Sequence, residues 1–412
     1  MNRDHTALNP APIAHLVNLG QVGGVESMML SVARRLHPDR DHGGLTLTDH
    51  LHPQWKSQWP PQGLALCPLK RWGPVRLREK GWLHQQILRR RLQHNGQPAA
   101  ALLWGLWPSE PVLKTLRVEG IRIIYMEHGS AWRSEPGGRL AKGLPWADQV
   151  ITNSAAAKRV LELGWGLDRP TTVLLNPLRP EAAPSAPRAA PPRDQANPLR
   201  VGLVGRCEPF KGFELALHAA RILQRKSVAL CMEVAGDGPE RPRLEQLAER
   251  LGLGQVVRFH GNISDMASFY GGLDLLLCPS LRESFGLVSI EAQAWGVPVV
   301  VSGVDGLPET VHAGETGTVI RPSLTTQDLI NCDVAAARLP RWVYDPSTDT
   351  LGEPKGVAPE AIAAAIQRYA EHETMRQTHG SAASQWAFQR FHMDNYVRQL
   401  SALLHTPATE TR

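Results

Sequence analysis

Short apolar runs alternate with amphipathic stretches along both halves of the chain. Many of the runs are rich in Val, Ile and Leu, which is typical of parallel strands buried on both faces of a sheet. The stretches between them repeat apolar positions at helical spacing, as in Phe213–Arg225, where Leu215, Ala219 and Leu223 share one face. This alternation occurs in each half and predicts the α/β class with two doubly wound sheets.

The predicted strands occur in both halves of the chain. In the first half they are Ile13–Val17, Leu45–Thr48, Ala101–Trp104, Ile121–Tyr125, Gln149–Thr152 and Thr172–Leu175. In the second half they are Arg200–Val204, Leu230–Ala235, Val256–His260, Leu275–Cys278, Pro298–Ser302 and Thr318–Ile320. Open α/β sheets bind ligands outside the carboxyl ends of their strands, so the loops that follow these runs are the candidate sites.

A break in composition separates the two halves. Seven prolines and six alanines fall between Pro177 and Pro198, which excludes a helix or a sheet ladder and predicts a linker. We therefore predict an N-terminal domain over residues 1–178, a linker over 179–198, a C-terminal domain over 199–381 and a terminal helix over 382–412. A second irregular stretch, Ser323–Gly356, is interpreted as an insertion or surface loop.

Composition narrows the class of protein only a little. With 412 residues, 42% of them apolar and 20% charged, the chain is long enough for two globular domains. It has no apolar run long enough to span a membrane, and Met1–Pro12 lacks the pattern of a signal peptide. Its five scattered cysteines favour a reducing compartment, so we expect a cytoplasmic protein. The net charge of +6 suits anionic partners without choosing among them.

The first candidate loop is Gly20–Glu26, which follows the strand Ile13–Val17 and precedes a helical pattern. Its glycines would let backbone amides approach a phosphate at the start of the helix. The spacing matches neither a dinucleotide fingerprint nor a Walker loop, so a tight strand–helix turn remains an equal alternative.

The second candidate loop is Gly205–Gly212, directly after Arg200–Val204. Arg206 and Lys211 are five residues apart on it and can converge on a diphosphate, the first as a bidentate fork and the second as a point charge. The alternative is a pair of solvated cations on a surface loop.

The third candidate segment runs from Pro279 to Glu291 and follows the strand Leu275–Cys278. Gly286 allows the chain to turn, and a helix begins there, so the amides of Leu287 and Val288 are available to a phosphate. Two acidic residues beside a phosphate site need an explanation, because their carboxylates repel the phosphate. Recognition of polyols supplies it, with Glu283 accepting from sugar hydroxyls and Glu291 from a ribose diol. Two surface glutamates are the alternative.

Several of these segments, in this order, resemble family 4 of the retaining glycosyltransferases, the glycosyl transferases of group 1. The resemblance is dense from Leu199 to Arg321. Its motifs there are Gly205–Gly212, Ala235–Glu240, Asn262–Leu277, Glu283 with seven residues before Glu291, Ala294–Val300 and Val304–Glu309. In the first half it is thinner and rests on the glycine loop, Glu127-His128-Gly129, Ile151–Ser154 and Asn176-Pro177.

The resemblance implies a GT-B architecture. Two facing Rossmann-like domains would enclose a cleft, with the donor held in the C-terminal domain and a terminal helix, Ala382–His405, crossing back to the first. By the same resemblance, Arg206 and Lys211 would bind the donor pyrophosphate, Glu291 the ribose and Glu283 the transferred sugar. The site residues further implied are the amides of Phe285, Gly286, Leu287 and Val288, with His128 on the sugar and Gly24 near the phosphates.

The implied reaction transfers a hexosyl unit from a nucleotide-diphosphate sugar to a glycan or lipid-linked acceptor, with retention of anomeric configuration. Arg206 and Lys211 would stabilise the departing phosphate, and Glu283 and His128 would act on the sugar. No enzymatic nucleophile is evident, so we expect same-face attack by the acceptor. We expect no cofactor, no obligatory metal and no nucleic-acid partner. Asp39-Arg40-Asp41 matches a metal-binding pattern but is interpreted as a turn.

The segment Lys70–Leu92 carries eight Lys or Arg residues and one acid, with tryptophan and leucine interleaved. It is a candidate surface for anionic lipid, which would make the protein peripheral at the inner face of a membrane. A solvated basic face over a core stripe is the alternative. A role in bacterial surface polysaccharide or glycolipid assembly is the broadest function that these features suggest.

Three other functions remain open. A sugar-nucleotide epimerase of related fold would share the phosphate loops, and a non-catalytic nucleotide-sugar-binding protein would share the whole site. An NAD-dependent dehydrogenase would need the GxGxxG fingerprint, which neither half shows cleanly.

Overall fold

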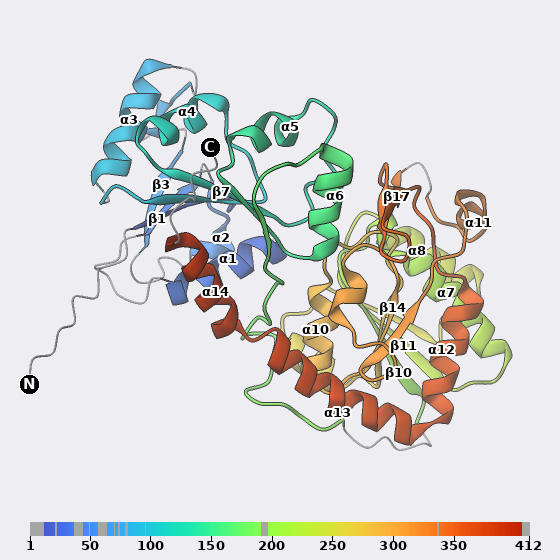
Figure 1. The fold of residues 1–412 in the computed structure, drawn as a ribbon. Helices are drawn as coiled ribbons and strands as arrows, with labels where there is room; N and C mark the ends of the chain where they lie inside the picture. Colours follow the sequence, from blue (N-terminus) through green and yellow to red (C-terminus); the bar gives the residue numbers. More distant parts are fainter. Residues whose placement is uncertain are drawn as a thin grey trace, which may run out of the picture. The chain divides into compact units, whose positions relative to one another are not determined.

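The fold divides into two compact units of parallel β-sheet and helices in a computed structural model (Figure 1). The structure describes residues 12–20, 23–36, 44–48, 50–56, 64–69, 71–72, 75–78, 81–94, 96–190, 197–335 and 338–405. Unit 1 comprises Met1–Asn153, Trp165–Leu174 and Asp394–Arg412, and unit 2 comprises Ser154–Gly164 and Leu175–Met393.

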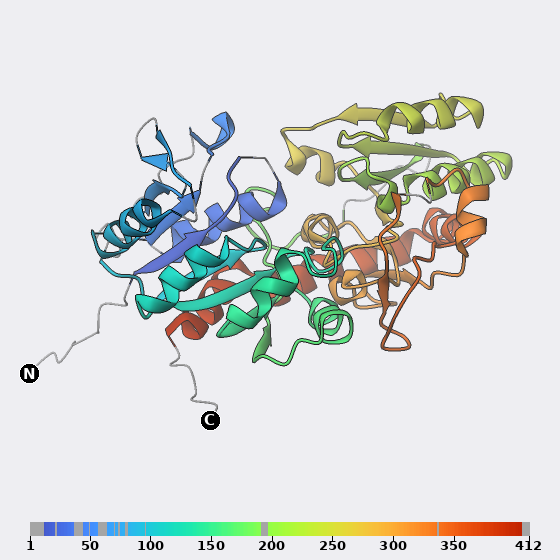
Figure 2. The same cartoon turned by 90° about the horizontal axis from the view of Figure 1, so that it is seen from above.

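Unit 1 is built on a seven-stranded sheet in which all neighbouring strands are parallel. The order across the sheet is β3 (Leu64–Pro68), β2 (Gly44–Thr48), β1 (Ile13–Leu16), β6 (Ala100–Trp104), β7 (Arg122–Glu127), β8 (Gln149–Thr152) and β9 (Thr171–Val173). Its helices are α1 (Gly24–Leu36), α2 (Pro53–Lys56), α3 (Trp82–His94), α4 (Glu110–Val118) and α5 (Arg139–Gly143). Figure 1 and Figure 2 show these strands gathered in one sheet, coloured blue to green.

Unit 2 has a six-stranded parallel sheet. The order is β12 (Val257–Gly261), β11 (Leu230–Ala235), β10 (Leu199–Val204), β13 (Leu275–Cys278), β14 (Val299–Ser302) and β15 (Gly317–Ile320). Its helices are α6 (Ala155–Trp165), α7 (Phe213–Arg225), α8 (Arg241–Arg250), α9 (Met266–Gly271), α10 (Leu287–Ala294), α11 (Thr326–Asn331), α12 (Pro359–Glu371) and α13 (Glu373–Arg390). This is the 3-2-1-4-5-6 order of the Rossmann fold.

Alternate residues of the unit 2 strands face two different cores. In β13, Leu275 and Leu277 pack into the cluster formed with α7, α8 and α12, whereas Leu276 and Cys278 pack into the cluster formed with α9 and α10. Figure 1 shows α7 and α12 on one side of the strands and α10 on the other. Burial on both faces explains why the strand sequences are continuously apolar.

The twelve predicted strands are all present, with ends shifted by two residues or fewer. Three features were missed, the first of them the short antiparallel pair of β4 (Arg71–Trp72) and β5 (Val75–Arg76). Another is β3, which within the described residues is an edge strand paired with β2; it ends at Pro68, so its short run resembles a loop. The irregular stretch Ser323–Gly356 contains α11 and an antiparallel hairpin of β16 (Val343–Asp345) and β17 (Thr350–Gly352), whose strands are only three residues long.

The Pro/Ala-rich segment differs from a free linker. Its described part belongs to unit 2, where Ala182 and Ala190 are buried. The Trp295 indole N–H donates to the carbonyl oxygen of Ala182 at 2.8 Å, and the Arg188 amide donates to Ser384 Oγ at 2.8 Å. The prolines disfavour regular structure here, but they do not prevent the segment from packing on the end of α10 and on α13.

The predicted terminal helix is two helices, α13 in unit 2 and α14 (Met393–His405), whose residues from Asp394 onward belong to unit 1. An Arg122 guanidinium nitrogen donates to the carbonyl oxygen of Leu403 at 2.5 Å, and Arg35 lies 3.5 Å from Asp394. The expected return of the terminal helix to the first domain is therefore confirmed. Within the described residues, no helix is long and apolar enough to span a membrane.

Candidate functional site

The order of the unit 2 strands explains where its candidate residues meet. β10 and β13 are neighbours, and the sequence order of the strands reverses between them. Loops that leave the carboxyl ends of two such strands diverge to opposite faces and leave a crevice, which is where doubly wound sheets bind ligands. The loop after β10 carries Lys211, and the loop after β13 carries Glu283.

Lys211 and Glu283 form an ion pair at this point. The ammonium nitrogen of Lys211 lies 2.5 Å from Glu283 Oε2, and each side chain is 17% exposed. Gly212, which has a positive φ of 66°, permits this approach, because an added Cβ would lie 2.3 Å from the carbonyl oxygen of Pro279. The structure thus joins two residues that the sequence placed on separate loops, and it presents one cation and one anion to the crevice.

Arg206 has a different environment from Lys211. Its side chain is 72% exposed and pairs with Glu208 at 2.8 Å. An exposed guanidinium on a loop can reorient at little cost. Its predicted contact with a pyrophosphate stays a prediction.

Glu291 is fully buried on α10 and already has protein partners. Arg179 Nε lies 2.6 Å from its Oε1, and the Tyr270 hydroxyl donates to its Oε2 at 3.0 Å. Burial lowers the pKa of Arg179, but the charge and the hydrogen bond of Glu291 outweigh this, so the pKa is raised overall. A carboxylate has about four acceptor sites, so Glu291 can bind a ribose diol while it stays bonded to Arg179. Binding of the ribose by Glu291 stays a prediction.

The segment before α10 offers backbone rather than side chains. Phe285 is 1% exposed and packs edge-to-face on Phe391, so only its main chain is available to a ligand. Gly286 has a φ of 108°, and an added Cβ would lie 2.5 Å from a Leu307 methyl group. The helix starts at Leu287, and the amides of its first turn, including that of Val288, have no intrahelical acceptor.

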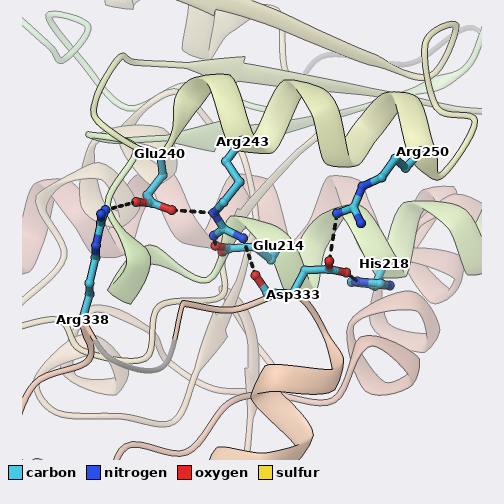
Figure 3. Close-up of polar contacts among 7 residues, drawn as sticks. All are labelled: Glu214, His218, Glu240, Arg243, Arg250, Asp333 and Arg338. Carbon is cyan, nitrogen blue, oxygen red and sulfur yellow. Dashed lines mark hydrogen bonds and ion pairs between the residues drawn. The ribbon is translucent and has the colours of Figure 1, made fainter.

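An ion-pair network in unit 2 contacts the backbone of the loop that carries Lys211. Figure 3 shows the residues of this network. Glu240 binds Arg338 at 2.5 Å and Arg243 at 2.7 Å, and Arg243 also contacts Glu214 in α7. The amide of Glu240 donates to the carbonyl oxygen of Cys207 at 3.1 Å. The network therefore connects α7, α8 and the segment after α11 to the backbone of the Gly205–Gly212 loop.

A cavity of about 390 Å³ lies at the corresponding switch point of unit 1, where β1 and β6 are neighbours. Its polar wall comprises Asn18, Thr48, Ser109, Ser130, Ser134 and Arg139, and leucine, valine and tryptophan side chains form the rest. The Ser109 hydroxyl is buried and has no hydrogen-bond partner among the described residues. Its volume and lining are those of a small-molecule pocket with free hydrogen-bonding capacity.

His128 lies directly after β7 in unit 1. Its ring stacks on Trp104 with centroids 5.7 Å apart and planes 4° from parallel. Burial lowers the pKa of His128 to about 4, so the ring is neutral at pH 7. Neither ring nitrogen has a partner within the described part of the chain, which leaves one donor and one acceptor for a ligand.

Glu127 fixes the turn that carries His128. Its carboxylate accepts from the Gly129 amide at 2.5 Å and from the Ala131 amide at 3.1 Å. Gly24, the other candidate of this unit, is the first residue of α1. Two residues of its loop, Gln21 and Val22, lie outside the described residues.

Within the described residues, no group of three His, Cys, Asp or Glu side chains is arranged to hold a metal ion. The metal-like pattern Asp39-Arg40-Asp41 lies outside them.

The basic segment Lys70–Leu92 has two faces in its described part. Leu88 and Leu92 of α3 are buried, so one side of the helix belongs to the core. Trp82 is 73% exposed and Leu83 46% exposed, which leaves apolar side chains at the surface among arginines. The core stripe is confirmed for the described part of the segment, and its contact with anionic lipid stays a prediction.

Comparison with known proteins identifies the class of the second unit. Residues 190–331 match the family model of the glycosyl transferases group 1. The chain is also 34% identical over 193 residues to a D-inositol 3-phosphate glycosyltransferase of Streptomyces bingchenggensis, which covers 42% of each protein. A protein of the same description from Corynebacterium urealyticum is 40% identical over 129 residues, 29% of this chain and 30% of that protein. The matches span about two fifths or less of these relatives.

Solved structures match over nearly the whole chain. HepE of Anabaena, in complex with UDP and glucose, has a TM-score of 0.69 at 19% identity and covers 96% of this chain and 99% of that one. A glycosyltransferase of Rickettsia africae has a TM-score of 0.69 at 14% identity, covering 98% and 100%. The resemblance to this family is confirmed over part of unit 2, and the GT-B fold class predicted from the sequence is confirmed.

Proposed function

We propose that the protein is a retaining glycosyltransferase that moves a hexosyl unit from a nucleotide-diphosphate sugar to a glycan or lipid-linked acceptor. The observation that carries the proposal is the Lys211–Glu283 pair, 2.5 Å apart at the switch point of unit 2. The amides at the start of α10 supply a second attraction for phosphate. UDP and glucose in the HepE complex make UDP-glucose the first donor to test.

Lys211 and Glu283 act on different parts of the donor, Lys211 on the phosphate and Glu283 on the sugar. The Lys211 ammonium stabilises the charge that develops on the departing phosphate, which is the position where a fixed cation lowers a barrier most. Glu283 accepts hydrogen bonds from hydroxyls of the transferred sugar. The acceptor hydroxyl attacks the anomeric carbon from the face that the phosphate leaves, and the phosphate takes its proton. Trapping a covalent glycosyl–enzyme species would overturn this mechanism.

Unit 1 is the proposed acceptor domain. Its cavity combines unpaired polar atoms with apolar walls, as expected for a sugar ring or another polyol. The Streptomyces relative is named for D-inositol 3-phosphate, and Arg139 at this cavity would suit such a phosphorylated polyol. We favour a glycan or glycolipid acceptor in bacterial surface polysaccharide assembly. Inositol phosphate serves as the direct alternative in acceptor assays.

Thermal-shift measurements with UDP, GDP, ADP and their sugars test the donor site directly. Glu283→Ala should impair donor consumption more than nucleotide-diphosphate binding, because the carboxylate contacts the sugar. Glu249→Ala, an exposed glutamate of α8, is the matched control and should change neither. If no nucleotide or nucleotide sugar binds, the proposal is wrong. Release of an altered free sugar nucleotide would favour the epimerase, and binding without turnover the non-catalytic protein.

We expect donor consumption to need no added metal and to survive chelation. Loss of activity in EDTA that only a divalent cation restores would contradict this expectation.

We further propose that the exposed edge of the basic segment binds anionic lipid at the inner face of the cytoplasmic membrane. Leu83→Ser should reduce flotation with vesicles that contain anionic lipid. Leu163→Ser is the matched control, since Leu163 is 45% exposed and Leu83 46% exposed. If the unmodified protein does not float with these vesicles, the membrane role is excluded.

A further inference from the structure

The β16–β17 hairpin is fastened to the rest of unit 2 by a two-point ion pair. Arg159 of α6 contacts Asp349 through Nε to Oδ1 and through Nη2 to Oδ2, each at 2.8 Å. The Tyr344 hydroxyl donates to the same carboxylate at 2.8 Å. Planar bidentate pairs of this kind fix orientation as well as position. The position of the hairpin is therefore fixed by side-chain contacts, even though its sequence resembles a surface loop.

Asp305 connects this hairpin to the loop after β14. It is 1% exposed and has a positive φ of 49°, which a residue with a side chain rarely adopts. Its amide donates to the carbonyl oxygen of Tyr344 at 2.9 Å, and its Oδ1 accepts from the Tyr344 amide at 2.7 Å. A buried aspartate in this conformation persists only where its surroundings hold it, and the hairpin backbone does so here.

The second carboxylate oxygen of Asp305 reaches the candidate donor site. Asp305 Oδ2 accepts from the backbone amide of Glu283 at 2.9 Å. The next residue, Gly306, donates its amide to the carbonyl oxygen of Glu283 at 3.1 Å. The main chain of Glu283 is thus fixed on both sides, while Lys211 fixes its carboxylate.

We propose that Asp305, supported by the β16–β17 hairpin, is a positioning residue for Glu283. The proposal deepens the proposed function and rests on it. Glu283 lies on a loop, and a group that must meet sugar hydroxyls loses its effect when it is displaced by about 1 Å. Asp305 limits the movement of Glu283. Its Oδ1 bonds the hairpin at Tyr344, and its Oδ2 bonds the amide of Glu283. It touches no substrate and acts only through Glu283.

Asp305→Gly tests this role. Glycine adopts the left-handed backbone freely, so the variant loses the carboxylate without backbone strain. We expect kcat/KM for the donor to fall about tenfold to a hundredfold, as for lost hydrogen bonds to a charged group. The Kd of the nucleotide diphosphate should stay within about twofold, because Glu283 contacts the sugar. Amide hydrogen exchange should quicken in residues 279–286.

A double-mutant cycle separates positioning from a general structural role. In the Glu283→Ala background, Asp305→Gly should cause no further loss, because the group that it positions is already absent. Asp345→Asn is the matched control on the same hairpin. Its carboxylate accepts from the Ser347 amide at 2.8 Å, and the variant should leave all three readouts unchanged.

If the unmodified protein turns over its donor, three results for Asp305→Gly would overturn the inference. These are an unchanged kcat/KM, a loss of kcat/KM that adds fully to that of Glu283→Ala, or an equal loss of affinity for the nucleotide diphosphate. If Asp305→Gly does not fold, Asp305→Asn keeps the shape and replaces one acceptor by a donor, and the same criteria apply. If the unmodified protein binds no nucleotide sugar, the proposed function fails instead. Unchanged exchange of the Glu283 amide would then still count against the Asp305 link.

Discussion

Both sheets have a switch point between neighbouring strands, β1 and β6 in unit 1 and β10 and β13 in unit 2, but the polar side chains of the two units are arranged differently. In unit 2 the charged groups are already paired, Lys211 with Glu283 and Arg179 with Glu291. In unit 1 the polar atoms of His128 and Ser109 are buried and have no partner among the described residues. The charged groups of unit 2 are thus held by their own side-chain partners, whereas these polar atoms of unit 1 keep their hydrogen-bonding capacity.

This difference matches two kinds of recognition. Fixed cations and carboxylates are needed where charge develops during a reaction, because they then require no reorganisation. Neutral donors and acceptors suffice where a polyol must be bound and oriented. The comparison predicts that substitutions in unit 2 affect both stability and turnover, whereas those in unit 1 affect mainly turnover.

The largest effect is expected at the buried pair of unit 2. Arg179→Met leaves Glu291 buried without its cation, so the free energy of unfolding should fall by about 3–5 kcal/mol. Urea unfolding of the full chain measures this. Arg179→Lys keeps the charge and should recover part of the loss. A cost below about 1 kcal/mol, typical of exposed pairs, would show that the pairing contributes little.

Removing the other cation of unit 2 should act on the reaction. Lys211→Ala should lower kcat for donor consumption by about a hundredfold to a thousandfold, the usual cost of losing one group that stabilises transition-state charge. Lys226→Ala removes a cation at the end of α7 whose Nζ bonds Gln367, and it should have no such effect. Retention of most of the activity in Lys211→Ala would remove the central residue of the proposed site.

In unit 1, His128→Phe keeps a ring to stack on Trp104 but removes both nitrogens. Transfer to the acceptor should fall about tenfold, the value of one good hydrogen bond, while nucleotide-diphosphate binding is unchanged. The exposed His94→Phe is the control. An equal loss of nucleotide binding would erase the distinction between the two units.

The same variant has a consequence for stability against pH. The folded pKa of about 4 lies below the ordinary value of 6.5, so the unfolded chain binds more protons between these values. Stability should therefore fall as the pH decreases from about 6.5 to 4. His128→Phe should make this decrease shallower, as measured by thermal unfolding across that range, whereas His94→Phe should not.

The smallest effect is expected at an exposed pair of unit 2. Arg250 is 62% exposed and lies 2.8 Å from Asp333 (Figure 3). Arg250→Ala should cost about 0.2–1 kcal/mol of unfolding free energy, and salt should reduce the difference. A cost that approaches that of Arg179→Met would mean that burial does not distinguish the two pairs.

The sequence predicts the strands well because they are buried on both faces of a sheet. Such strands consist of continuous runs of apolar residues, which are visible in the sequence. It also places Lys211 and Glu283 on loops after strands. It cannot show that these loops are neighbours, since that depends on the order β10-β13, which the chain reaches only after two further strands.

The partners of Glu291 were missed for a similar reason. Arg179 comes from the segment interpreted as a linker, and Tyr270 comes from another helix. Asp305 lies in the motif Val304–Glu309, but its role could not be predicted, because its φ of 49° and its hydrogen bond to Glu283 exist only in the folded chain. Local patterns predict elements, whereas pairings between distant segments require the topology.

The division of the chain has a consequence for its synthesis. Tyr396, Leu400 and Leu404 of α14 are buried, and they belong to unit 1 although they follow unit 2 in the sequence. A ribosome makes all of unit 2 before it makes these residues. The apolar face of unit 1 that these residues cover can therefore be completed only after unit 2 has been synthesised.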